Sequence, residues 1–270
     1  MRSVPALPAV AVIFALLLTT LFAGCGLLPE VVDETAGWTA EKLYSEAKDA
    51  MGDGAFDKAI KLFEKLESRY PYGRYAQQAQ LEIAYAHFRL SDAAAAISAC
   101  DRFIRLHPNH PSVDYAYYLK GLVNFNEDLG LFGNISNQDL SERDPKAARE
   151  SFETFKELLT KFPDSKYAAD ATARMKYLVN ALASHEVHVA RYYMNRRAYI
   201  APVNRAQGAL KSFPEAPAGE EALYLMIKSY DAMGLNDLRD DSERVMRLNF
   251  PKSGFLEYGL ERPAPWWKFW

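Results

Sequence analysis

The sequence predicts an all-α fold, a right-handed superhelical solenoid of five helix-turn-helix repeats. Five helical patterns each end in a residue followed by proline, at intervals of 37, 55, 51 and 37 residues: Tyr70-Pro71, His107-Pro108, Phe162-Pro163, Phe213-Pro214 and Phe250-Pro251. Eight residues after each of the first four prolines stands an alanine, at Ala79, Ala116, Ala171 and Ala222. Small residues at a fixed offset suit close helix packing, and the spacing fits the tetratricopeptide repeat, a unit of about 34 residues that stacks on its neighbours.

The first unit shows the repeat most clearly. Its second helix has apolar residues at positions i, i+3, i+4 and i+7, the spacing of one helix face. Gly52-Asp53-Gly54 marks the turn between its two helices. The predicted inward residues are Leu43, Ala47 and Ala50 on the first helix and Phe56, Ala59, Ile60, Phe63 and Leu66 on the second.

The other units follow the same pattern with two long intervals. Unit three is interrupted, because Gly and Asn in the segment 128–139 favour a loop between helices near 112–126 and 145–161. In unit five Arg239 replaces the small residue of the second helix. The expected inward residues are Ile83, Ala84, Ala96 and Phe103 in unit two, Val189, Ala190, Tyr193 and Ala209 in unit four, and Leu223, Met226, Tyr230 and Met246 in unit five.

The N-terminus is typical of a bacterial lipoprotein. An uncharged apolar stretch from Ala9 to Phe22 is too short to span a bilayer, and small residues at Ala23 and Gly24 precede Cys25. Cys25 is therefore predicted to be the lipidated mature N-terminus, with acyl chains that anchor the protein stably. Gly26, in place of Asp, favours sorting to the periplasmic face of the outer membrane.

Six segments follow from these patterns. They are a signal peptide (1–24), a lipidated linker (25–38), N-terminal repeats (39–125), an inserted loop (126–144), C-terminal repeats (145–258) and an aromatic tail (259–270). The tail ends in Trp266-Trp-Lys-Phe-Trp270 and contains prolines, which exclude helix. A membrane contact, a partner contact and a cap on the last helix are the three alternatives for it.

Composition argues against several classes of function. The chain has 32 Lys and Arg residues against 35 Asp and Glu, so nothing suggests nucleic-acid binding. With Cys25 lipidated, Cys100 has no partner for a disulfide and is expected to be a small buried apolar residue. His185 and His188 lie at i and i+3 rather than the i and i+4 of a zinc protease helix, so no metal site is expected. No nucleophile and base pair, phosphate loop or cofactor motif stands out, and we expect no enzyme and no cofactor.

Two clusters are candidates for binding. Arg191, Arg196, Arg197 and Arg205 gather on the fourth unit, where forked guanidinium groups suit carboxylate recognition; a solvated face is the alternative. Tyr70, Tyr72 and Tyr75 cluster at the first bend between units. Tyrosine there can stack on a peptide side chain, or it can pack between repeats.

Six segments cover most of the predicted mature chain and are more specific than the repeat pattern: Arg69-Tyr-Pro-Tyr-Gly-Arg-Tyr-Ala-Gln-Gln78, Asp101–Tyr115, Ser141-Glu-Arg-Asp-Pro145, Ser165-Lys-Tyr-Ala-Ala-Asp-Ala171, Val189-Ala-Arg-Tyr-Tyr193 and Val203-Asn-Arg205. In these segments the chain resembles the BamD family of outer-membrane lipoproteins of the β-barrel assembly machinery. The resemblance implies an essential, non-catalytic partner of BamA that recruits BamC and BamE where present and helps to receive unfolded β-barrel outer-membrane proteins.

The resemblance also selects residues. It implies that Arg205, with Asn204 beside it and Arg197 in the same cluster, binds an acidic residue of the last periplasmic POTRA domain of BamA. It implies that Tyr70, Tyr72 and Gly73 help to receive the C-terminal targeting strand of the substrate. The alternatives are a periplasmic tetratricopeptide protein of cell division or peptidoglycan synthesis, of the CpoB type, and a lipoprotein hydrolase. The first would show an N-terminal coiled coil, and the second a nucleophile with its base.

Overall fold

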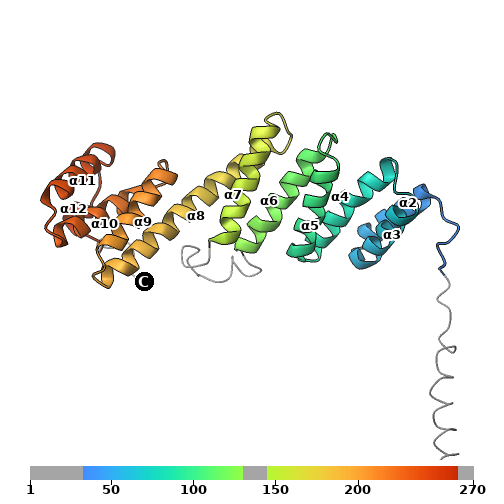
Figure 1. Ribbon diagram of the computed structural model, residues 1–270, viewed down its shortest axis with the longest axis horizontal. Helices are drawn as coiled ribbons and strands as arrows, with labels where there is room; N and C mark the ends of the chain where they lie inside the picture. Colours follow the sequence, from blue (N-terminus) through green and yellow to red (C-terminus); the bar gives the residue numbers. More distant parts are fainter. Residues whose placement is uncertain (1–32, 130–144, 261–270) are drawn as a thin grey trace, which may run out of the picture. The chain divides into compact units, whose positions relative to one another are not determined.

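The computed structural model describes residues 33–129 and 145–260, and the helices in this part of the chain belong to the compact unit Ala40–Trp270 (Figure 1). They form five helical hairpins, each helix packing against the next along the chain, and the described residues contain no strand. The hairpins are α2 (Ala40–Gly52) with α3 (Phe56–Arg69), α4 (Arg74–Arg89) with α5 (Ala93–Leu106), α6 (Val113–Leu129) with α7 (Lys146–Lys161), α8 (Ala168–Asn195) with α9 (Ile200–Ser212), and α10 (Gly219–Ala232) with α11 (Asn236–Asn249). A short helix, α12 (Phe255–Tyr258), follows the last hairpin.

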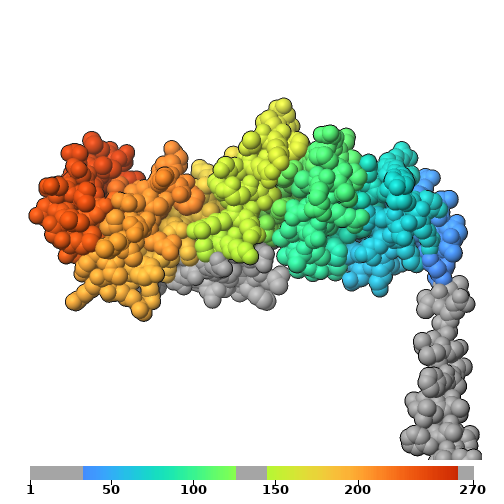
Figure 2. Space-filling view, viewed as in Figure 1, coloured from blue at the N-terminus to red at the C-terminus, as the bar shows by residue number. Residues whose placement is uncertain are grey.

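The predicted all-α repeat fold is confirmed by this arrangement. The space-filling view shows the units in sequence order, as expected for a solenoid in which each unit contacts its neighbours (Figure 2). All four alanines that follow the prolines have no exposed surface; they are Ala79, Ala116, Ala171 and Ala222. The small side chains therefore let each first helix lie close to its neighbours, as their fixed offset predicts.

The residue before each proline ends the second helix of its unit in the same way. Its φ lies between −128° and −136° and its ψ between 56° and 64°, while its N–H still bonds the carbonyl four residues back. Proline forces this departure because its ring disfavours the helical conformation in the preceding residue. The five residues are Tyr70, His107, Phe162, Phe213 and Phe250. The Pro pairs are thus regular stops that set the angle between units.

The turn inside a unit also repeats. In units one, two, four and five a residue with φ between 59° and 76° follows the first helix, at Gly54, Ser91, Arg197 and Gly234. The N–H of the next residue bonds the carbonyl five residues back, at 2.8 to 3.1 Å. This is the Schellman ending of a helix, in which glycine is favoured because a left-handed backbone crowds a Cβ atom. Serine and arginine occupy that position in units two and four.

The two long intervals have different causes. In unit three α6 runs through Leu129, four residues into the segment expected to be loop, and residues 130–144 lie outside the described part. In unit four the extra length is helix, because α8 has 28 residues where α10 has 14. The N-terminal part of α8 contributes Leu178 and Leu182 to the core around α6 and α7, and its C-terminal part contributes Val187 and Ala190 to the core around α9 and α10.

Gly121 on α6 lies directly against a side chain of α7. A Cβ atom built on Gly121 would lie 2.4 Å from the ring of Phe155, which is fully buried on α7. The hydroxyl of Ser151 also donates a 2.9 Å hydrogen bond to the Gly121 carbonyl. Glycine is therefore required here by space.

Cys100 is fully buried on α5, among Ala84 of α4 and Leu119 of α6. Burial raises the pKa of its thiol to about 12, so the thiol stays protonated at neutral pH. Cys100 thus packs as a small apolar residue, as the sequence predicts.

Candidate functional sites

Tyr72 lies at the bend between units one and two. It is the most exposed of the large hydrophobic residues in the described part of the chain. Its side chain is 94% exposed, whereas Tyr70 is 38% exposed and also caps the end of α3. Gly73 precedes α4 with φ 125°, a conformation that a residue with a Cβ atom rarely adopts. The glycine sets the direction of the chain after Tyr72, so the tyrosine is presented to solvent by the backbone.

Tyr75 has a different environment from Tyr72. Its ring lies 5.4 Å from the ring of Tyr44 on α2, and the guanidinium of Arg74 lies 4.9 Å above it. Packing between units therefore accounts for Tyr75. It does not account for Tyr72, which projects away from the helices.

A groove of about 650 Å³ lies beside the first helices of units one to four, and the sequence analysis did not anticipate it. Four tyrosines line it: Tyr44 of α2, Tyr85 of α4, Tyr115 of α6, and Tyr167 directly before α8. Tyr44 also donates a 3.3 Å hydrogen bond to Glu82, and burial, with Glu82 adding to it, raises its pKa to about 12. These tyrosines have no common offset from the prolines, so the repeat pattern gave no signal for them.

The fourth unit presents Arg205 through an ion cluster that joins three helices. Glu186 on α8 is 9% exposed and receives hydrogen bonds from two arginines. Arg149 of α7 donates at 2.8 Å to one carboxylate oxygen, and Arg205 of α9 donates at 3.0 Å to the other. The Arg205 side chain remains 45% exposed. Two guanidinium groups share one carboxylate, so the cluster carries a formal charge of +1 toward solvent.

The neighbouring predicted residues are exposed. Asn204 lies on α9 directly before Arg205. Arg197 takes the left-handed position in the turn between α8 and α9, with φ 60°. This conformation costs a residue with a Cβ atom roughly 1–2 kcal/mol, so glycine would be favoured there by backbone energy alone. Arg196 lies beside it, with its guanidinium 4.6 Å from the ring of Tyr192.

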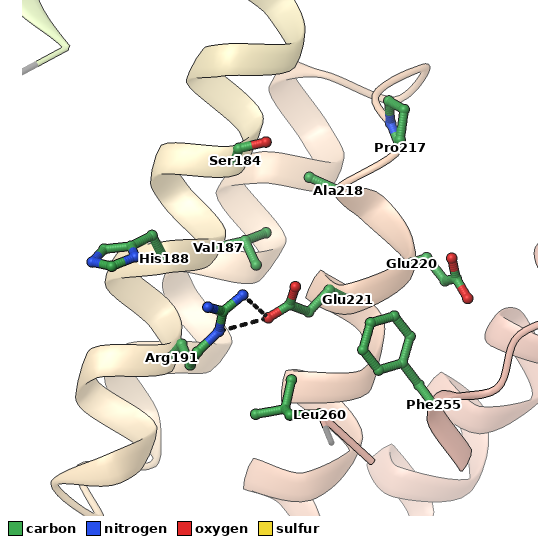
Figure 3. Close-up of a pocket in the computed structure, with 10 residues that line it drawn as sticks. All are labelled: Ser184, Val187, His188, Arg191, Pro217, Ala218, Glu220, Glu221, Phe255 and Leu260. Atoms are coloured by element: carbon green, nitrogen blue, oxygen red, sulfur yellow. Dashed lines mark hydrogen bonds and ion pairs between the residues drawn. The ribbon is translucent and has the colours of Figure 1, made fainter. Parts of the chain in front are cut away.

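Arg191 lies on α8 and is bound by a residue of the last unit. It points from α8 toward α10 and makes two hydrogen bonds, of 2.6 and 2.9 Å, to one oxygen of Glu221 (Figure 3). This pair lies in a second groove, of about 690 Å³, that we call the C-terminal groove. Ser184, Val187, His188, Arg191, Pro217, Ala218, Glu220, Glu221, Phe255 and Leu260 line it. Arg191 lies on unit four like the other three arginines, but its guanidinium is engaged by Glu221.

Other predicted features lie elsewhere. Cys25 and the tail from residue 261 are outside the described residues. Within the described ranges no group of three His, Cys, Asp or Glu side chains could hold a metal ion. None of the helices described for this chain combines the length and the apolar character that crossing a membrane requires.

The fold and these surfaces define a class, a helical-repeat scaffold whose exposed side chains and grooves suit protein binding. A family model described as outer membrane lipoprotein, YfiO, matches residues 37–245. The chain belongs to this family.

Relatives from several bacteria support the same assignment. The outer membrane protein assembly factor BamD of Neisseria meningitidis serogroup A is 48% identical over 237 residues, which cover 87% of this chain and 89% of that protein. The factor of the same name from Vibrio cholerae serotype O1 is 36% identical, covering 87% and 96%, and that of Haemophilus influenzae is 30% identical, covering 94% and 93%. These matches confirm the resemblance drawn from the sequence motifs and disfavour a protein of the CpoB type.

Proposed function

We propose that this protein is a lipid-anchored scaffold for the assembly of β-barrel proteins in the outer membrane. Acyl chains on Cys25 hold it at the periplasmic face. The arginines of unit four bind BamA, and the first bend receives unfolded β-barrel proteins. The scaffold performs no chemistry of its own, and it acts by holding a partner and a substrate on one rigid stack of helices.

The presentation of Arg205 is the observation that carries this proposal. Glu186 is nearly buried and fixes one N–H of the guanidinium at 3.0 Å, while almost half of the side chain stays exposed. A guanidinium has five N–H donors, so an acidic residue of a partner can be bound while Glu186 keeps its bond. Fixing the side chain in advance also lowers the entropy cost of binding.

The backbone conformation of Arg197 supports its inclusion in the proposed BamA-binding surface. An arginine in a position that favours glycine suggests that its side chain has a use that offsets the backbone strain. Arg197 lies at the end of the α8–α9 hairpin, and Arg205 lies on the second helix of that hairpin. Together with Asn204 they form an exposed basic and polar surface on one unit, suited to an acidic partner.

At the first bend the substrate would meet an exposed aromatic ring next to a groove lined by tyrosines. Unfolded β-barrel proteins expose apolar and aromatic side chains, and tyrosine can stack on these while its hydroxyl keeps a hydrogen bond. Tyr72 is exposed at the bend, and Tyr44, Tyr85 and Tyr115 line the groove. Tyr70 and Gly73 hold the backbone on either side of this ring.

Affinity capture tests the proposed function. The tagged full chain is purified from solubilised cell envelopes, and the proteins that come with it are identified by mass spectrometry. We expect BamA among them, together with acyl chains on Cys25. Recovery of the acylated chain with cell-division or peptidoglycan proteins, and without BamA, would overturn the proposal.

We expect Tyr72→Ala to weaken the binding of substrate without lowering stability. The side chain is 94% exposed and contributes almost nothing to packing, so thermal unfolding should be unchanged. Loss of a stacking anchor should weaken binding of a fluorescent peptide, carrying the C-terminal strand of a barrel protein, by about 1–2 kcal/mol. Fluorescence anisotropy measures the change.

Two control variants accompany Tyr72→Ala. Tyr72→Phe keeps the ring and should keep most of the affinity. Leu248→Ala removes another exposed side chain, 74% exposed on α11, and should leave binding intact. Equal peptide affinity for Tyr72→Ala and the unchanged chain would assign the tyrosine no part in substrate binding.

A further inference from the structure

The C-terminal groove has the dimensions and lining of a site for an aromatic segment. Its volume of about 690 Å³ lies within the range of ligand sites in proteins, about 300–1,000 Å³. Its lining is mixed: Val187, Ala218, Phe255 and Leu260 are apolar and lie among polar and charged side chains. The guanidinium of Arg191, held flat by Glu221, adds a surface on which an aromatic ring can stack (Figure 3).

The end of the described chain enters this groove. The helix α12 ends at Tyr258, and Gly259 after it has a φ of 66°, which takes the backbone out of the helix. A Cβ atom on Gly259 would lie 3.1 Å from the hydroxyl of Tyr224 on α10, so the backbone passes very close to α10 here. Leu260, the next residue, is itself part of the groove lining. The described part of the chain therefore ends in the lining of the groove.

The ten residues that follow have the composition that the groove requires. They include two prolines, a residue type that disfavours helix, and four aromatic residues within the last five positions: Trp266, Trp267, Phe269 and Trp270. A segment of ten residues can reach at most about 33–36 Å from Leu260. Four exposed aromatic rings would be a large apolar patch in water, and the end of a solenoid needs a cap.

We propose that the chain's own segment 261–270 occupies the C-terminal groove, with an indole ring stacked on Arg191. The covalent attachment of this segment favours it over a separate peptide as the occupant of the groove. A segment joined directly to the groove lining has an effective concentration in the millimolar range, so a free peptide of similar composition would be at a disadvantage. The tail thus covers the apolar surface of the last unit and fixes α8, α10 and α12 to one another.

Photocrosslinking in cells tests this proposal on the full chain. Benzoylphenylalanine replaces Trp267, the cells are irradiated, and crosslinked peptides are identified by mass spectrometry. We expect crosslinks within the chain to the segments 184–191 and 217–221, which form the two walls of the groove. Capture of lipid, of another protein, or of residues of this chain outside the groove would overturn the proposal.

A pair of matched variants confirms that the groove itself is the site. Ser184 is exposed and lines the groove on α8, so Ser184→Trp fills it with little effect on the fold. We expect this variant to lose the crosslinks to both walls. Ser212→Trp introduces the same ring at an exposed position on α9 outside the groove lining and should leave the crosslinks unchanged. Equal loss in both variants, or loss in neither, would contradict occupation of the groove.

Discussion

Arg205→Glu is expected to release the protein from BamA. The substitution places a carboxylate where the proposed partner presents one, and it removes the guanidinium that Glu186 holds at 3.0 Å. Disruption of an interfacial charge pair weakens binding by roughly 2–5 kcal/mol, so affinity should fall by about 30-fold to several thousand-fold. Surface binding measurements with the purified periplasmic domains of BamA quantify the loss, and capture from solubilised envelopes should no longer recover BamA.

The ion cluster provides the controls for this variant. Arg149→Gln breaks the other bond to Glu186 and leaves Arg205 in place, so it reports the effect of disturbing the cluster alone. Glu186→Gln removes the internal negative charge, which raises the formal charge of the cluster from +1 to +2. We expect it to retain BamA or to bind it more tightly. Unchanged recovery of BamA with Arg205→Glu would refute the assignment of Arg205.

Gly121→Val is expected to be the most damaging substitution in the described part of unit three. The Cβ atom alone would lie 2.4 Å from the ring of Phe155, which is fully buried and cannot move into solvent. Overpacking of this kind costs about 1–3 kcal/mol and sometimes more. The circular dichroism signal should therefore show unfolding several degrees lower than in the unchanged chain.

A second substitution separates overpacking from loss of the fold. Phe155→Leu removes the ring that the new side chain meets, so the double variant Gly121→Val/Phe155→Leu should be more stable than the sum of the two single effects predicts. Gly208→Val offers a contrast on α9, since a Cβ atom there meets nothing within 4 Å. Because valine has a higher helix propensity than glycine, this variant should be at least as stable as the unchanged chain. Equal destabilisation at both glycines would show that space at Gly121 is not the cause.

The fold could be predicted from the sequence because its signals are local and repeat. Each residue before a proline leaves the helix, and each alanine eight residues later is buried, so a single unit gives the rule for the rest. The length of α8 could not be predicted in this way. An interval of 51 residues between Pro163 and Pro214 is compatible with a loop or with a longer helix, and the stops alone do not distinguish them.

The candidate sites depend on contacts between distant residues, which a single sequence does not reveal. His185 and His188 are the more conspicuous residues of this stretch of sequence, but Glu186 between them is the residue that binds the two arginines. Its partners, Arg149 and Arg205, lie 37 and 19 residues away. Tyr72 and Tyr75 are only three residues apart, yet Tyr72 is exposed and Tyr75 packs against Tyr44. This difference follows from the bend at Gly73, which their spacing in the sequence does not predict.

The length of α8 has a consequence for how force and motion pass through the protein. One uninterrupted helix contributes Leu178 to one core and Val187 to the next. The two cores are therefore joined by a continuous helix, with no loop between them. In a stack of separate hairpins each junction can flex independently. Because both cores include side chains of α8, we expect a displacement of unit four to move unit three with it.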